Sequence, residues 1–493
     1  MNNLMNLRSA VAIALFVCHS LCSQHVLAQG SIKTPGSVFQ TTNIWTVHLT
    51  FTPEQWQKME PEERARTQPR SPGSPGSGSF LQGPEGGRNG IIAAFGVTFD
   101  YVRADLEFGA ARFKDVGVRY KGNGTFMSSR NTLKRSLKID LNEFVKGQKL
   151  AGMPQINLHN SVRDPGSMNE AIAYRLFRNA SVPAPRTAYA KVFITVPGEH
   201  DKRYFGLYTL VEDIGKPFAE EWFKSDRGAI LKPVTPSVFS DLGDDWKSYN
   251  QTYDPKGTLS NEQKQRIISF AKFVTHTNDA AFATGLGDFL DLDNFARYMA
   301  LTVWLCDLDG ILGPGQNYYV YLHPDSRKFM FIPWDQDQTF GQFPRGSSSE
   351  QRENLSIHKP WSGENRFLER VFKVDQFKNL YLARLKEFND TVLKPQTIRQ
   401  YVDELASVLR PSVQEESPAR LIEYDKATKG EAINISMGPS GFGGTAVKPI
   451  KAFVEPRSQS VRDQLSGKSE GQTISSGFGF GPPRGRPGPP REN

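Results

Sequence analysis

The chain has 493 residues, of which 38% are hydrophobic and 23% are charged, and its formal net charge is +8. This length is enough for one large domain or two ordinary ones. The basic excess is modest, and no dense basic run is interleaved with aromatic residues, so we expect no nucleic-acid partner.

The N-terminal residues 1–28 are typical of a secretory signal peptide. Arg8 supplies a short positive region, an apolar stretch follows at 10–17, and Val26-Leu27-Ala28 offers a cleavage site. The apolar stretch is shorter than the roughly 20 residues needed to cross a bilayer, and no later segment is a better candidate. We therefore expect no transmembrane anchor, and a secreted, periplasmic or cell-surface location once the signal is removed.

The three cysteines bear on export and on stability. Cys22 is a weaker candidate for the acylated residue of a lipoprotein signal. Otherwise Cys18 and Cys22 leave with the signal, and Cys306 alone remains. A disulfide framework is then excluded, and stability has to come from an ordinary hydrophobic core.

Two segments have compositions that do not support a packed core. Residues 67–90 form a Gly/Pro/Ser-rich insertion, which we expect to be flexible, and residues 467–493 form a Gly/Pro/Arg tail, which we expect to be disordered. The insertion separates an N-terminal strand–helix segment at 29–66 from one folded domain at 91–466, and the tail follows that domain.

Apolar periodicity indicates strands first and helices later. The sequence predicts strands at 43–52, 115–121, 136–141, 188–196 and 206–212, and a hairpin at 317–322 and 328–333. It predicts helices at 53–59, 167–179, 259–276 and 291–306, and mainly helical structure over 365–410 and 448–465. A β-rich first part followed by a helix-rich second part is an α+β arrangement.

Two charged side chains in the first part have a predicted orientation. Lys138 alternates with Leu137 and Ile139, so it lies on the opposite face of its strand. Ser167 and Glu170 have the spacing of a capping box at the start of a helix. A strand lysine followed by a helix glutamate is also the pair that protein kinases use to hold nucleotide phosphates.

A group of acidic and amide side chains surrounds the predicted hairpin. Asn317 opens its first strand, Asp335 and Asp337 follow its second strand, and Asp309 precedes it by a short loop. The two ends of a hairpin lie side by side, so these oxygens are expected to converge. Oxygen ligands of this kind suit Mg²⁺ or Mn²⁺, which hold substrate phosphates. The cluster therefore predicts phosphoryl transfer, although a single loop aspartate commonly caps a turn.

One alternative uses the same residues. The sequence from Asp335 through Asp337 to Thr339 resembles the DxDxT motif of haloacid-dehalogenase phosphatases, in which the first aspartate is a nucleophile and the second an acid/base. That motif usually opens a doubly wound domain, whereas the chain after Gly341 predicts mainly helices.

Several stretches, in order along residues 100–465, resemble the CotH (spore coat protein H) family of atypical protein kinases. They are Val116-Gly-Val-Arg-Tyr-Lys-Gly-Asn-Gly-Thr-Phe126, Arg135-Ser-Leu-Lys-Ile139, Asn157-Leu-His-Asn160, Val182-Pro-Ala-Pro-Arg186, Gly206-Leu-Tyr-Thr-Leu-Val-Glu212, Leu231-Lys-Pro233, Asn317-Tyr-Tyr-Val-Tyr321, Ile332-Pro-Trp-Asp-Gln-Asp337 and Thr339-Phe-Gly341. The resemblance implies a two-lobed kinase-like fold, ATP with Mg²⁺ or Mn²⁺, and phosphate transfer to Ser or Thr of a protein.

The resemblance also implies roles for individual residues. Lys138 would contact the phosphates and pair with Glu170, and Glu212 would lie near the hinge between the lobes. Asp309 would be the catalytic carboxylate. Asn317 and Asp335 would hold the metal, with Asp337 beside them. The remaining alternative is a non-catalytic surface or coat-assembly protein that keeps the fold.

Overall fold

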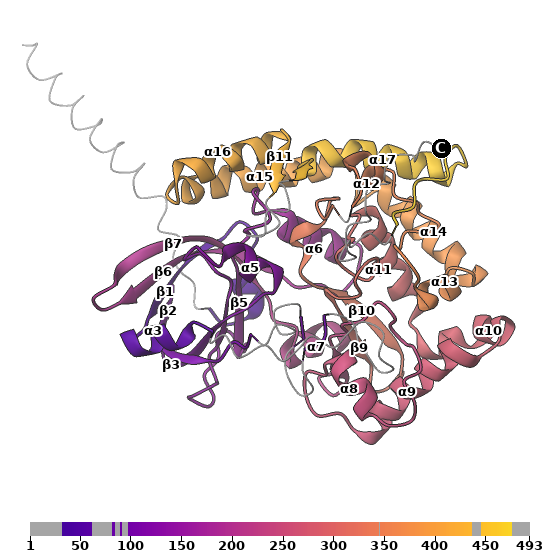
Figure 1. Cartoon of the computed structure of the whole chain (residues 1–493), viewed down its shortest axis with the longest axis horizontal. Helices are drawn as coiled ribbons and strands as arrows, with labels where there is room; N and C mark the ends of the chain where they lie inside the picture. Colours follow the sequence, from indigo (N-terminus) through magenta and orange to yellow (C-terminus); the bar gives the residue numbers. More distant parts are fainter. Residues whose placement is uncertain are drawn as a thin grey trace, which may run out of the picture.

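The computed structural model describes residues 32–61, 81–83, 89–90, 97–344, 346–435 and 445–475. The predicted signal peptide, most of the predicted insertion and the end of the predicted tail lie outside the described residues. A β-barrel occupies one side of the molecule, and a smaller sheet surrounded by helices occupies the other (Figure 1). Each side has its own hydrophobic core, which confirms the α+β class.

The barrel closes from seven strands in the order β1-β2-β3-β4-β5-β7-β6. They are β1 (Ile44–Thr50), β2 (Val102–Phe108), β3 (Ala111–Tyr120), β4 (Leu137–Asp140), β5 (Gln155–His159), β6 (Thr187–Val196) and β7 (His200–Val211). The neighbours are antiparallel except β1 and β6, whose parallel pairing closes the barrel. Leu137 and Ile139 are buried in the barrel core, and Lys138 lies on the opposite face of β4, as predicted.

Helix α6 (Asn169–Asn179) connects the barrel to the second core, and it starts differently from the prediction. Ser167 adopts a positive φ of 55°, and the cap residue Met168 makes no side-chain cap. The Asp164 carboxylate accepts a hydrogen bond from the Asn169 N–H at 2.7 Å and so caps the N-terminus of the helix. The predicted capping box was therefore wrong, and the carboxylate of Glu170 points elsewhere.

The second core surrounds a three-stranded antiparallel sheet of order β10-β9-β8. Its strands are β8 (Ala229–Leu231), β9 (Tyr318–Leu322) and β10 (Phe329–Pro333). Tyr318 pairs with Pro333, so the predicted hairpin is confirmed and its two open ends lie side by side.

Helices pack around this sheet, across the molecule and against the barrel. The remaining elements are α2 (Pro35–Val38), α3 (Pro53–Met59), α5 (Gly124–Ser129), α7 (Lys216–Phe223), α8 (Lys247–Tyr253), α9 (Asn261–His276), α10 (Asp279–Phe289), α11 (Leu292–Trp304), η1 (Gln336–Gln338), α12 (Ser349–Glu353), α13 (Arg366–Val371), α14 (Asp375–Asp390), α15 (Pro395–Gln414), α16 (Pro418–Lys429), β11 (Ile433–Ile435), β12 (Thr445–Val447) and α17 (Ile450–Leu465). No helix in the described ranges has both the length and the apolar character that a membrane crossing requires.

The C-terminal helices α15, α16 and α17 lie along one edge of the molecule and extend over both cores (Figure 1). Glu416, between α15 and α16, pairs with Lys134 at 2.7 Å on the barrel side. Arg457 of α17 is fully buried and donates hydrogen bonds to the main-chain carbonyls of Val303 and Trp304 at the end of α11.

Short pieces of the two predicted low-complexity segments are part of the folded structure. Gln82 donates hydrogen bonds to the Val234 carbonyl at 3.1 Å and to Thr252 at 3.0 Å. After α17, Gln472 pairs with the chain at Leu355, and Ile474 is buried. The folded chain therefore continues beyond residue 466.

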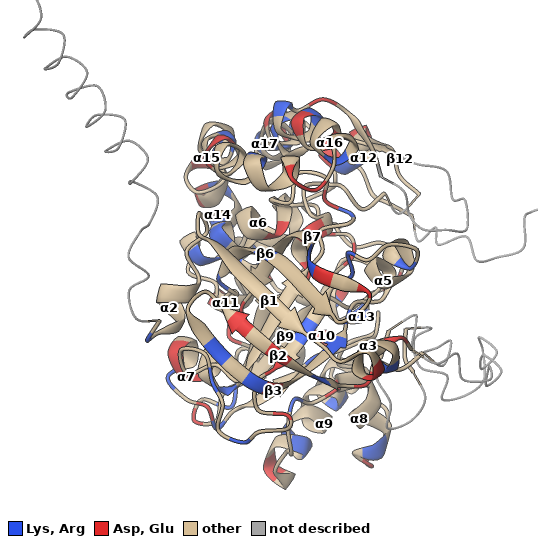
Figure 2. Cartoon of the chain, turned by 90° about the vertical axis from the view of Figure 1, so that its left-hand side faces the viewer, with Lys and Arg blue, Asp and Glu red and all other residues tan. Residues whose placement is uncertain are grey.

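Charges of both signs are interspersed over the barrel face that is turned toward the viewer in Figure 2. Two pairs on β2 and β3 illustrate this: Lys114 with Asp105, and Arg112 with Glu107 at 3.6 Å. Pairs this exposed contribute little to stability.

Candidate functional site

A cavity of about 640 Å³ lies between the barrel and the three-stranded sheet. The barrel contributes residues from the ends of β3, β4 and β5, and α6 and the loop after β7 contribute others. The opposite wall comes from the ends of β8 and β10 and from the start of β9. This volume is in the range of small-molecule and cofactor sites.

Four lysines line the cavity: Lys121, Lys138, Lys232 and Lys256, of which Lys256 is paired with Asp254 at 2.6 Å. Lys138 Nζ is bonded to Asp213 Oδ1 at 2.9 Å. The ammonium groups of Lys121 and Lys232 lie over the Trp334 ring, 5.1 and 5.9 Å from its centre. Burial, helped by the charges of Lys138 and Lys232, lowers the pKa of Lys121 to about 7, and the Asp335 carboxylate opposes the shift.

Lys121 belongs to a chain of hydrogen bonds along the cavity wall. Its ammonium is in close contact with His159 Nε2, and His159 Nδ1 is bonded to Glu170 Oε2 at 2.7 Å. The Tyr174 hydroxyl donates to Glu170 Oε1 at 3.0 Å and accepts from the Asp335 N–H at 2.9 Å. The chain therefore connects the end of β3 with the residues after β10.

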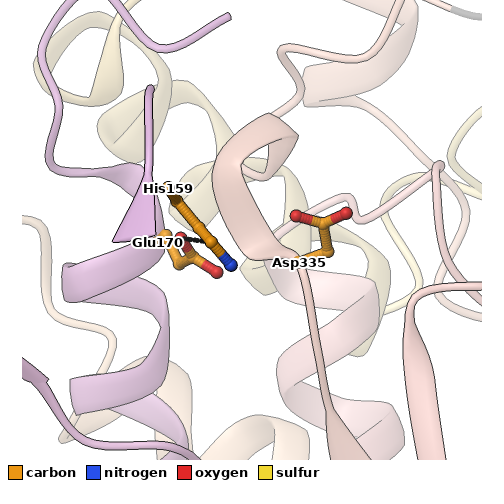
Figure 3. Close-up of side chains that lie close together, drawn as sticks. All are labelled: His159, Glu170 and Asp335. Carbon is orange, nitrogen blue, oxygen red and sulfur yellow. Dashed lines mark hydrogen bonds and ion pairs between the residues drawn. The ribbon is translucent and has the colours of Figure 1, made fainter. Parts of the chain in front are cut away.

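Figure 3 shows His159 and Glu170 joined, with Asp335 on the facing element. Potential ligand atoms of these three residues lie within 4.8 Å of one another, close enough to surround one cation. Lys121 already contacts one nitrogen of His159, and Glu170 engages the other. The imidazole therefore has no nitrogen left for a metal, and the lysine ammonium is the cation that this group holds.

Asp309 is held by amide side chains beside the cavity. Gln316 donates to Oδ1 at 3.0 Å, and Asn317 and Gln338 donate to Oδ2 at 3.0 and 3.2 Å. Amide donors of this kind stabilise the charged form of a carboxylate and fix its direction. Asn317 itself lines the cavity, so it connects Asp309 with the site.

The neighbouring carboxyl groups are buried more deeply. Asp307 is 2% exposed and accepts a hydrogen bond from Gln336 at 3.0 Å, and burial raises its pKa to about 7. Burial also raises the pKa of Asp337, which the nearby Asp335 carboxylate raises further. A cation near Asp335 and Asp337 would relieve this repulsion.

The structure brings five of the seven predicted site residues to one cavity: Lys138, Glu170, Asn317, Asp335 and Asp337. Asp309 adjoins the same cavity through Asn317. Glu212 does not line it: this residue is 3% exposed and accepts a hydrogen bond from Arg186 Nε at 3.0 Å.

The predicted pair between Lys138 and Glu170 is replaced by two others. Lys138 forms an ion pair with Asp213, and Glu170 is hydrogen-bonded to His159. The reason is local geometry: His159 at the end of β5 stands beside Glu170, and Asp213 follows β7 next to Lys138.

Among the lining residues that had no predicted role are Lys121, His159, Asp213 and Lys232. Lys121, His159 and Lys232 lie inside stretches that resemble the CotH family, and Asp213 directly follows one. The resemblance to the family therefore marked these stretches, but only the folded barrel shows that the side chains line one cavity.

The chain topology around Asp335 bears on the phosphatase alternative. The DxDxT motif follows a strand of a parallel, doubly wound sheet, but β10 is the edge strand of an antiparallel sheet. The described part of the chain after Gly341 contains helices and the small β11–β12 pair. This topology does not fit a haloacid-dehalogenase fold.

Comparison with known proteins identifies the family. The family model described as CotH kinase protein matches residues 118–433, which is more than half of the chain. The chain belongs to the CotH family. It is also 22% identical over 356 residues to inner spore coat protein H of Bacillus subtilis (strain 168), across 71% of this chain and 88% of that protein. The matched CotH region includes the cavity-lining residues from Arg119 to Asp337, whereas Asn89, Gly90, Phe99 and Tyr101 precede it.

Proposed function

We propose that this CotH family member is a phosphotransferase that moves the γ-phosphate of ATP to a Ser or Thr hydroxyl of a protein, with Mg²⁺ or Mn²⁺. One observation carries the proposal: four lysines and several carboxylates line a single cavity of about 640 Å³. Crowded lysines repel one another, and a polyphosphate relieves that repulsion. The family description supports the same reaction.

The donor set of the cavity suits a hard divalent cation. Asn317 offers an amide oxygen, and Asp335 and Asp337, two residues apart in the sequence, offer carboxylates that repel each other. These residues would hold the ion. When bound, such an ion neutralises charge on the transferred phosphate.

The remaining groups have separate tasks in the proposed reaction. Cavity lysines other than Lys138, whose ammonium is paired with Asp213, bind the phosphates. Asp309 orients the acceptor hydroxyl and takes its proton. The hydroxyl oxygen forms a bond to the γ-phosphorus while the bond from that phosphorus to the β-phosphate bridging oxygen breaks, and ADP leaves. Glu212 holds Arg186 next to the Asp213 segment and acts at a distance from the substrate.

We further propose that the protein is exported and acts at a surface or coat. The sequence of residues 1–28 motivates this, and so does the name of the Bacillus relative, an inner spore coat protein. Cell fractionation with antibody detection tests it, and an uncleaved protein retained in the cytosol would contradict it.

The first experiment is thermal unfolding of the protein with ATP and Mg²⁺ or Mn²⁺. A ligand at 100 times its dissociation constant stabilises the folded state by about 2.7 kcal/mol. We expect such a shift in the wild type and its loss in Asp335→Asn. The matched control is Asp325→Asn, because Asp325 lies in the exposed turn of the same hairpin and lines no part of the cavity.

Transfer itself is measured by mass spectrometry of candidate acceptor proteins incubated with ATP. Asp309→Asn should abolish phosphorylation while retaining the ATP-dependent thermal shift. An absence of any shift with ATP or other nucleoside triphosphates, for either metal, would refute the enzyme and favour the non-catalytic coat protein.

A further inference from the structure

The two lysines that the barrel contributes to the cavity, Lys121 and Lys138, have different surroundings. Lys138 is already neutralised, because its ammonium bonds to Asp213 and that carboxylate also accepts from Asn157 at 3.1 Å. Lys121 has no carboxylate in direct contact among the ion pairs of the described residues; its close polar partner is the His159 ring. The ammonium of Lys121 is therefore available to pair with an anionic ligand, whereas the ammonium of Lys138 is already paired with a carboxylate.

The charge of Glu170 reaches Lys121 through the imidazole. His159 Nδ1 donates to Glu170 Oε2 at 2.7 Å, which leaves Nε2 as the acceptor for the lysine. The Glu170 carboxylate polarises the ring and fixes its tautomer, so the lysine is held in one direction. The ring also packs edge-on against Trp334, with centroids 5.8 Å apart, over which the Lys121 ammonium lies.

The other end of this chain fixes Asp335. This residue has a φ of 55°, a left-handed conformation that is uncommon for a residue with a side chain. Its N–H donates to the Tyr174 hydroxyl at 2.9 Å, and Tyr174 donates onward to Glu170 at 3.0 Å. One buried carboxylate therefore positions both the lysine on the barrel and the aspartate after β10.

We propose, on the basis of the function proposed above, that Lys121 contacts the phosphates of the nucleoside triphosphate. In this arrangement His159, Glu170 and Tyr174 are positioning residues that fix Lys121 relative to Asp335. The chain from Lys121 through His159 replaces a direct lysine–glutamate pair. Lys138 instead holds Asp213 in place at the start of the loop after β7.

The test compares ATP with adenosine binding to the full-length protein by calorimetry in the presence of Mn²⁺. Lys121→Met should weaken ATP binding roughly 10- to 100-fold, the effect of losing one charged hydrogen bond, and leave adenosine binding within about threefold. Lys138→Met should change the ratio of the two affinities by less than about threefold. A reversed pattern, with Lys138→Met selectively losing ATP, overturns the assignment of Lys121 while the proposed function stands.

The role of His159 is tested by a pair of variants. His159→Leu should weaken ATP binding relative to adenosine binding, as Lys121→Met does. In His159→Gln, the side-chain amide can accept from Lys121 and donate to Glu170, so ATP binding should return to within about fivefold of wild type. A purely structural role predicts equal damage from both variants, and equal damage would overturn the relay.

Circular dichroism verifies that each variant is folded. A second variant, Lys121→Gln, keeps a hydrogen-bond donor for His159 but removes the charge. If Lys121→Met is poorly folded, Lys121→Gln carries the test, with the same expected loss of ATP over adenosine. A wild-type protein that binds adenosine and ATP equally well overturns both the relay and the phosphotransferase.

Discussion

Tyr174 offers a direct measurement of the chain between Glu170 and Asp335. Its side chain is fully buried, and its hydroxyl makes two hydrogen bonds, at 3.0 and 2.9 Å. Tyr174→Phe removes the hydroxyl and leaves a carboxylate oxygen and a main-chain N–H without that partner. Each unsatisfied buried group costs about 1–3 kcal/mol, so we expect a loss of roughly 2–4 kcal/mol in the free energy of unfolding.

The assay is urea unfolding followed by tryptophan fluorescence, with the free energy extrapolated to water. Tyr208→Phe is the matched control, because Tyr208 is equally buried and its hydroxyl has no hydrogen-bond partner among the described residues. That variant should be neutral or up to about 1 kcal/mol more stable. If both variants have the same stability within about 0.5 kcal/mol, the hydrogen bonds of Tyr174 do not hold this segment together.

Three further predictions concern charge. The pKa of Lys121 is lowered to about 7 by burial, so the ammonium loses its proton as the pH rises through 7. ATP affinity should then fall from pH 7 to 9 by up to about tenfold per unit, measured by calorimetry, and Lys121→Arg should flatten the profile. Arg457→Met should lower the free energy of unfolding in urea by roughly 3–5 kcal/mol, because four main-chain carbonyls lose a buried charged donor. An effect below about 1 kcal/mol would contradict this. Glu416→Gln should destabilise the protein by about 1–3 kcal/mol at pH 7, through loss of the ion pair with Lys134. The pKa of Lys134 is lowered to about 8 by burial, so its charge is lost above pH 8 and the difference from wild type should shrink at pH 9. A difference that does not depend on pH would contradict the ion pair.

Local pattern was sufficient to predict parts of the fold that depend on neighbouring residues. The hairpin follows from two apolar runs around Pro324 and Asp325, and the outward face of Lys138 follows from strand alternation. Pairings over long sequence distances carry no such signal. The parallel contact of β1 with β6, which closes the barrel, joins residues such as Ile44 and Tyr189.

The same distinction explains the candidate site. The acidic cluster around Asn317 and Asp335 was predictable, because a hairpin brings its own two ends together. The partner of Glu170 was not, because the choice between Lys138 and His159 depends on how α6 packs against β5. The cap of α6 by Asp164 likewise depends on a turn that periodicity does not describe.

The helices that extend over both cores constrain how a ligand can enter. Glu416 pairs with Lys134, the Tyr204 hydroxyl donates to the Ser412 carbonyl at 3.0 Å, and α15 also packs on α17. Together these contacts join the C-terminal helices to the barrel and to one another along one edge of the molecule (Figure 1). Moving the barrel away from the helical side at this edge would break all of these contacts at once. This edge is therefore expected to stay closed when the two sides move relative to each other. A ligand that enters the cavity by a separation of the two sides would therefore enter away from α15, α16 and α17.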